Sequence, residues 1–137
     1  MLLNLIYRKE ILKVKISCGT DIIEIKRIKQ SIEDLGTKFL ERVYTNTEVE
    51  YCESKRSQKY QHYAARFAAK EAVFKAISRK LNNKYDIGWK NIEVVNDENG
   101  RPHAGLLGIE IKEIEEMDVS ISHCKEYAVA NVVVVWK

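Results

Sequence analysis

Two carboxylates and a dense group of cations are the residues of this sequence best suited to chemistry. Glu71 falls between Phe67 and Phe74 when about 100° per residue is assigned to the surrounding helical pattern, so we expect it inside an aromatic stripe. Burying an unpaired carboxylate costs several kcal/mol, so Glu71 needs a cation, several hydrogen bonds or a proton. The alternative is a surface ion pair with Lys75, four residues on, which contributes only about 0.3–0.5 kcal/mol.

Asp21 is the second such carboxylate. It follows Gly19 and Thr20 at the end of a predicted strand, where sites are commonly built, although an isolated acid there is more often a helix N-cap. Carboxylates from two distant segments suit Mg²⁺, which is held by one or two carboxylates, several waters and the phosphates of its substrate. Asp21 and Glu71 therefore form a candidate magnesium pair.

The cations are concentrated in one segment. Nine Lys and Arg residues and a single acid lie between Lys55 and Lys84, a local charge of +8 in a chain of net charge +3. Such a patch attracts nucleic acid, phosphorylated small molecules or acidic proteins, and its alternative is a solvated helix face. Another candidate is His123, but its neighbour Cys124 would point to the opposite face of a strand, which excludes a nucleophile pair. A structural hydrogen bond is the alternative role for His123.

The hydrophobic pattern predicts the elements that must position these residues. Alternation of Val14, Ile16, Cys18 and Ile22 with polar residues is typical of a half-buried strand. The other predicted elements are a helix over 25–35 that closes or kinks at Gly36, a helix begun by the Thr45–Glu48 capping box, a long helix over about 59–81 packed on two sides, and strands over 92–95, 119–123 and 128–136.

Composition limits the class of protein. The 137 residues are 45% hydrophobic and 31% charged with one proline and six glycines, which indicates one globular domain rather than a disordered or multidomain chain. No apolar run approaches the roughly 20 residues of a membrane helix, and we read no signal peptide. Cys18, Cys52 and Cys124 form no C-x-x-C pair, so we expect neither a disulfide framework nor a zinc site, and a reducing cytoplasm fits best.

Four segments together carry a resemblance to a known family. Gly19–Ile28 resembles the G-x-D-I-x-E-x-x-R-I signature of the holo-acyl-carrier-protein synthases, the small 4′-phosphopantetheinyl transferases. Arg66–Ala76 resembles their R-F-A-x-K-E-A-x-x-K-A motif, Asn99–Pro102 their N-G-x-P turn, and 119–130 their S-I-S-H…Y-A-x-A block. The motifs occur in the family's order and cover the chain from about Cys18 to Val135.

The resemblance implies an α+β fold in which a long central helix packs on an antiparallel sheet, assembled as a homotrimer with active sites between subunits. It implies transfer of 4′-phosphopantetheine from coenzyme A to a serine of apo-acyl carrier protein, releasing adenosine 3′,5′-bisphosphate, in fatty acid biosynthesis. In that reaction Asp21 and Glu71 would hold Mg²⁺, and Glu71 would act as the base, directly or through a metal-bound water. Lys75 would stabilise the phosphoryl oxygens and, with Arg66 and His123, bind coenzyme A, while Arg27 and Lys26 would meet the acidic carrier protein.

Two segments depart from the family pattern. Residues 1–13 form an N-terminal extension before the single domain, 14–137. Residues 78–87 replace a glycine-rich loop, and there Arg79 and Lys80 either anchor the 3′-phosphate of coenzyme A or lie in solvent on an extended helix.

Two rival functions remain open at this point. A small basic nucleic-acid-binding module would use the patch between Lys55 and Lys84, with steep salt dependence and indifference to Mg²⁺ and coenzyme A. It leaves Asp21 and Glu71 unexplained. A trimeric interaction domain without catalysis is the other rival, and the intact acidic pair argues against it. We expect neither a nucleic-acid partner nor a membrane.

Overall fold

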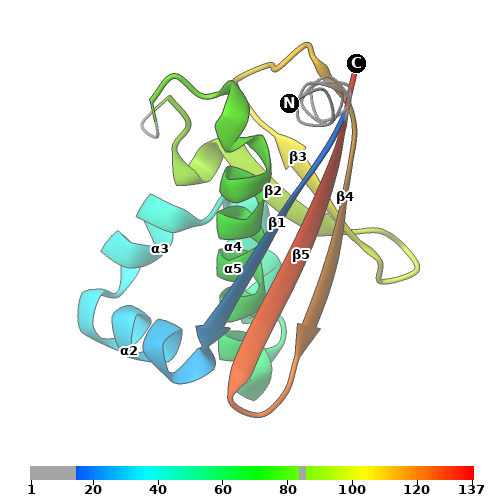
Figure 1. Ribbon diagram of the computed structural model, residues 1–137. Helices are drawn as coiled ribbons and strands as arrows, with labels where there is room; N and C mark the ends of the chain where they lie inside the picture. The colour runs from blue at the N-terminus through cyan, green and yellow to red at the C-terminus, as the bar shows by residue number, and fades with distance from the viewer. Residues whose placement is uncertain (1–14, 84–85) are drawn as a thin grey trace, which may run out of the picture.

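The computed structural model describes residues 15–83 and 86–137, and its main sheet has three antiparallel strands (Figure 1). Strand β5 (Tyr127–Trp136) lies between β1 (Ile16–Glu24) and β4 (Ile114–His123), in the order β1-β5-β4. β4 and β5 are joined by a short turn over residues 124–126. The predicted extension, residues 1–13, lies outside the described residues, as do Val14, Lys84 and Tyr85.

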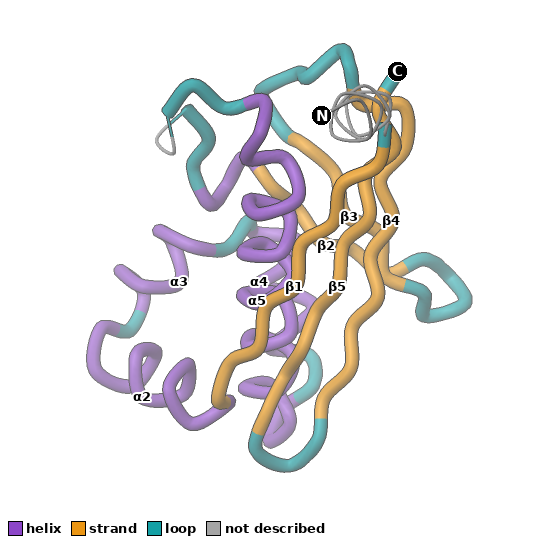
Figure 2. Tube along the Cα trace, in the orientation of Figure 1, coloured by secondary structure: helices purple, strands orange, loops and turns teal. Residues whose placement is uncertain are grey.

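A long helix, α5 (Lys59–Ile77), packs along one face of this sheet (Figure 2). Its alanines meet the alternate residues of β5 that face inward, and Ala68, Ala72, Ala130 and Val132 are all fully buried. Removing such apolar surface from water is the main stabilising contribution to this layer. The predicted α+β fold, with a central helix on an antiparallel sheet, is confirmed.

The sequence pattern gave the wrong inner face for β1. Ile16 and Ile22 are 56% and 63% exposed, whereas Gly19 on the other face is buried against α5. A Cβ at Gly19 would overlap the carbonyl oxygen of Ala72, so only glycine permits this approach of strand and helix. The face of β1 that carries Asp21 therefore points toward α5. The face that carries Ile16 and Ile22, which the alternation predicted to be buried, is exposed instead.

Three shorter helices cover the first half of α5. They are α2 (Ile25–Leu35), α3 (Thr37–Val43) and α4 (Asn46–Glu53), and they enclose a second apolar cluster with Tyr44 and Tyr63 at its centre. Gly36, at φ +57, ends α2 and separates it from α3. The predicted helix end or kink at this residue is confirmed.

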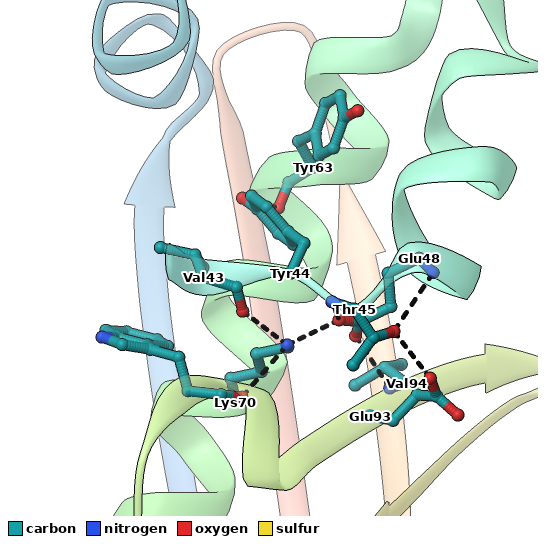
Figure 3. A network of polar contacts seen from close by, with 9 residues as sticks. Val43, Tyr44, Thr45, Glu48, Tyr63, Lys70, Glu93 and Val94 are labelled. Atoms are coloured by element: carbon teal, nitrogen blue, oxygen red, sulfur yellow. Dashed lines mark hydrogen bonds and ion pairs between the residues drawn. The ribbon is translucent and has the colours of Figure 1, made fainter. Parts of the chain in front are cut away.

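The predicted capping box of α4 is confirmed and belongs to a buried polar network (Figure 3). Thr45 accepts from the Glu48 N–H, and Glu48 Oε1 accepts from the Thr45 N–H at 2.9 Å. The same carboxylate forms a fully buried ion pair with Lys70 of α5 and accepts from the Val94 N–H through Oε2. Lys70 also donates to the carbonyl oxygen of Val43 at 2.7 Å, so the network ties α3, α4 and the second sheet to the central helix.

The second sheet is a hairpin of β2 (Ile92–Asn96) and β3 (Pro102–Leu106), preceded by the 3₁₀ turn η3 (Trp89–Asn91). Its turn is the N-G-x-P segment, where Asp97 Oδ1 accepts from the N–H groups of Asn99 and Arg101 and Gly100 adopts φ +80. β3 packs beside β4, which places this hairpin on the β4 side of the main sheet. Among residues 15–83 and 86–137, no helix combines the length and the apolar character that crossing a membrane requires.

Candidate functional site

Asp21 meets Lys75 where β1 passes α5, and Glu71, one helical turn before Lys75, lies close enough for the charge of Asp21 to act on it. The Lys75 ammonium donates to Asp21 Oδ1 at 3.1 Å and to the Thr20 carbonyl oxygen at 2.8 Å. The Asp21 side chain is only 17% exposed, so its ion pair with Lys75 is partly shielded from water. We call Asp21, Glu71 and Lys75 the acidic edge site.

The electrostatics of the acidic edge site fit a hard cation. Burial raises the pKa of Glu71, and the charge of Asp21 raises it further, while Lys75 acts in the opposite direction. The expected alternative, an ion pair of Glu71 with Lys75, is replaced by the pair of Lys75 with Asp21. Two oxygen donors that repel each other suit Mg²⁺, which keeps several waters and needs only one or two carboxylates.

Arg66 and His123 lie together at a second place, a pocket of about 270 Å³ on the β4 side of α5. Arg66 is 3% exposed and donates through Nη2 to Asn96 Oδ1 of β2 at 2.8 Å. Its Nε is buried and makes no hydrogen bond within the described part of the chain. A buried donor without an acceptor costs about 1–3 kcal/mol, so this Nε is a destabilising feature of the pocket. We call it the basic pocket.

Two further residues of the basic pocket escaped the sequence analysis. The Tyr51 ring lies under Arg66, with 4.0 Å between the ring centroid and Cζ, and meets the His62 ring edge-on at 5.5 Å. His62 also meets the His123 ring at 5.9 Å. The one available signal was helical spacing, because His62 precedes Arg66 by four residues and so shares its face of α5.

The acidic edge site and the basic pocket lie on opposite sides of α5. Asp21 pairs with Ala130 of β5, which pairs in turn with Ile121 of β4, a residue that lines the basic pocket. β1 and β4 are the two edges of the sheet and lie about 10 Å apart, and α5 packs along the face of the sheet that they share (Figure 1). On the helix itself, Arg66 and Glu71 are about 140° apart.

The predicted carrier-binding residues lie on α2, which follows β1 directly. Lys26 and Arg27 are both exposed. Lys26 borders a groove of about 630 Å³ that Lys29 and Lys125 of the β4–β5 turn also line, with Tyr127 as its aromatic residue. Arg27 lies outside the lining of that groove.

The segment that departs from the family pattern ends α5 early. The α-helix stops at Ile77, short of the predicted Leu81, and continues as one 3₁₀ turn, η2 (Ser78–Lys80). Arg79 and Lys80 are exposed, yet both lie over the Trp136 ring, at 6.0 and 5.9 Å from its centroid. Arg79 lies thirteen residues beyond Arg66 along α5 and η2, about 20 Å away, so the segment is not part of the basic pocket of its own chain.

The chain is similar to known proteins over most of its length. The family model described as the 4′-phosphopantetheinyl transferase superfamily matches residues 17–132. A holo-[acyl-carrier-protein] synthase from Ruminiclostridium cellulolyticum is 48% identical over 122 residues, which cover 85% of this chain and 89% of that protein.

Solved structures agree with this similarity. The crystal structure of a holo-(acyl-carrier-protein) synthase from Bacillus anthracis in complex with CoA (3′,5′-ADP) is 37% identical with a TM-score of 0.73, and the match covers 88% of this chain and 96% of that one. The ACPS-CoA complex from Chronobacterium ammoniagenes is 27% identical with a TM-score of 0.75, covering 89% and 98%.

Proposed function

Because the chain belongs to the 4′-phosphopantetheinyl transferase superfamily, we propose that it transfers 4′-phosphopantetheine from coenzyme A to a serine of apo-acyl carrier protein. Adenosine 3′,5′-bisphosphate is the other product. The observation that carries the proposal is the acidic edge site, where Asp21, Glu71 and Lys75 come together from two elements. We assign the reaction to fatty acid biosynthesis in the cytoplasm.

Asp21 and Glu71 are the residues that would hold Mg²⁺. The ion would supply positive charge to the pyrophosphate of coenzyme A as the phosphoryl group is transferred. Mg²⁺ dependence is therefore part of the proposal. Its support is the pair of mutually repelling carboxylates, which are positioned by the close approach of β1 to α5 at Gly19.

Glu71 and Lys75 divide the remaining chemistry. Glu71 would accept the proton of the carrier serine, directly or through a metal-bound water, because its carboxylate lies beside Asp21 and Lys75 in the acidic edge site. Lys75, with a side chain that is 52% exposed, would leave its contacts with β1 and turn toward the phosphoryl oxygens to offset their charge.

Arg66 and His123 would bind phosphate groups of coenzyme A in the basic pocket. Since that pocket and the acidic edge site lie on opposite sides of α5, one coenzyme A bridges them most simply when each group comes from a different copy of the chain. The uncovered sheet face supplies an apolar contact surface: Ile16, Ile22 and Val133 are 56%, 63% and 39% exposed. We therefore propose a homotrimer with active sites between neighbouring subunits.

The carrier protein would dock on the exposed basic residues Lys26 and Arg27 of α2. Acyl carrier proteins of the family's reaction are acidic, so opposite charges would steer the encounter. The alternative of a small nucleic-acid-binding module finds no support in the comparisons, and it leaves the acidic edge site without a role.

The chemistry is tested by chromatographic detection of adenosine 3′,5′-bisphosphate in mixtures of the protein, coenzyme A, Mg²⁺ and apo-acyl carrier protein. Release should require all four components. Release without the carrier would indicate hydrolysis of coenzyme A and would contradict transfer.

The shared site is tested by mixing two inactive variants, Glu71→Ala and Arg66→Ala, after dissociation and reassembly. If sites lie between subunits, random mixing in equal amounts restores about a quarter of the sites. If each site lies within one chain, the mixture stays inactive. Sedimentation velocity of the wild type gives the number of copies directly.

A further inference from the structure

His62 is a titratable residue of the basic pocket that the proposed reaction does not use. It lies on α5 one turn before Arg66, and it is partly buried. Its ring contacts Tyr51 and His123 edge-on, with centroid separations of 5.5 and 5.9 Å. The imidazole therefore lines the same space that the Arg66 guanidinium and His123 enclose.

The titratable and charged groups that face His62 are basic residues from three parts of the chain. They are Arg66 on α5, Lys55 after α4 and His123 on β4, and the fourth neighbour is the Tyr51 ring of α4. Burial is the largest cause, and together with Arg66, Lys55 and His123 it lowers the pKa of His62 to about 4. Without a ligand, the imidazole is therefore neutral near pH 7.

An anion in the basic pocket would reverse this field. Arg66, His62 and His123 all line the basic pocket, so a phosphate group that enters it meets all three side chains. A phosphate group at that position would place negative charge beside His62, and an opposite charge within about 4–6 Å favours the protonated imidazole. The effects of Arg66, Lys55 and His123 on His62 would then be offset.

We propose that His62 is a third anion-binding side chain of the basic pocket, and that it takes up a proton from solvent when a phosphate group of coenzyme A enters. The imidazolium then donates a hydrogen bond to the phosphate beside Arg66 and His123. This inference rests on the proposed function, which supplies the ligand. It predicts that nucleotide binding depends on pH through His62.

The three histidines of the chain make a direct test possible, because His62, His103 and His123 give three imidazole signals in a proton NMR titration. The probe is adenosine 3′,5′-bisphosphate, and His62→Gln assigns the signal. Saturation with the nucleotide should raise the pKa of His62 by about two units, which corresponds to about a 10-fold gain in affinity between pH 8 and pH 5.

The affinity for the nucleotide, measured by calorimetry between pH 5 and 8, should increase more steeply toward low pH in wild type than in His62→Gln. Ionisation of the ligand's own phosphates affects both proteins equally, so the difference isolates His62. His103→Gln is the matched control, because His103 pairs with Asp97 Oδ2 at 2.9 Å on the β2–β3 hairpin. This variant should keep the wild-type slope.

His62→Phe retains a ring against Tyr51 and His123, and it replaces His62→Gln if that variant fails to fold. If the nucleotide binds while the pKa of His62 moves by less than about half a unit, or if both His62 variants keep the wild-type slope, the inference is wrong and the proposed function stands. If the nucleotide does not bind, both the inference and the coenzyme A site are overturned.

Discussion

The Nζ of Lys75 lies 3.1 Å from Oδ1 of Asp21, although 54 residues separate the two in the sequence. The same ammonium donates to the Thr20 carbonyl oxygen, so it is held by β1 rather than by Glu71 on its own helix. The Glu71 carboxylate therefore remains close to the Asp21 charge while Lys75 compensates the other acid. The acidic edge site concentrates negative charge where a divalent cation would relieve it.

The free energy of unfolding should report this concentration of charge. The pKa of Glu71 in the folded protein is raised above its ordinary value of 4.5, so stability is present below pH 4.5 and is lost as pH rises through the raised pKa. Glu71→Gln removes this loss of stability, because glutamine does not ionise. In the absence of divalent cations, we expect the variant to be more stable than wild type at pH 7.5 and equally stable at about pH 4.

Urea denaturation with and without Mg²⁺ measures this effect. Added Mg²⁺ should stabilise wild type but not Glu71→Gln, because only the carboxylate pair binds the ion. The control is Glu98→Gln, in the exposed turn between β2 and β3, which should behave as wild type. A Glu71→Gln variant less stable than wild type at pH 7.5 would show that Glu71 is stabilised by partners instead.

Gly19→Ala should both destabilise the fold and displace Asp21 from Glu71. The added methyl would overlap the Ala72 carbonyl oxygen, and a clash with backbone is relieved only by moving β1 away from α5. Such overpacking costs about 1–3 kcal/mol. Gly105→Ala on β3 is the matched control, since a Cβ there meets nothing within 4 Å. Equal stabilities of the two variants in urea would contradict the close packing at Gly19.

Lys70→Met should lower the free energy of unfolding by about 3–5 kcal/mol, because it leaves the fully buried Glu48 carboxylate without its cation. Glu48→Gln in the same chain removes the stranded charge and should recover part of the loss. Chemical denaturation of both single variants and the double variant gives the coupling energy. A double variant less stable than Lys70→Met alone would mean that the hydrogen bonds of Glu48 outweigh its ion pair.

Arg27→Glu should raise the Michaelis constant for the carrier protein roughly tenfold, as loss of one ion pair and a new repulsion together amount to about 1.4 kcal/mol. The affinity for coenzyme A should be unchanged, and added salt should shrink the effect. Lys112→Glu is a matched control, because this exposed lysine lies beside Ile114, which pairs with Trp136 at the opposite end of the sheet. An equal loss in both variants would indicate steering by net charge alone.

Local patterns predicted the local features of this fold. The Thr45–Glu48 capping box and the Gly36 break depend on residues within four positions of each other, and both are confirmed. The motif residues Asp21 and Glu71 were expected to act together, and the structure places them on facing elements. The fold that the resemblance implies is also confirmed.

The features that the sequence missed depend on tertiary packing. Hydrophobic alternation predicted that Ile16 and Ile22 are buried, but α5 packs on the opposite face of β1, over Gly19. The small and polar residues of that face give no hydrophobic signal in the sequence. The burial of Lys70 and Arg66 was equally hidden, because their partners Glu48 and Asn96 lie on other elements. The position of His62 in the basic pocket could not be predicted either, because its ring neighbours Tyr51 and His123 belong to α4 and β4, which are separate elements.

The central claim is phosphopantetheine transfer at the acidic edge site, and the intact mass of the carrier protein tests it most directly. Apo-acyl carrier protein is incubated with coenzyme A, Mg²⁺ and either wild type, Asp21→Ala or Glu71→Ala. We predict that wild type adds one phosphopantetheine arm to a single serine, and that each variant adds none although it folds. An unmodified carrier with wild type, or a fully modified carrier with Glu71→Ala, would contradict the account.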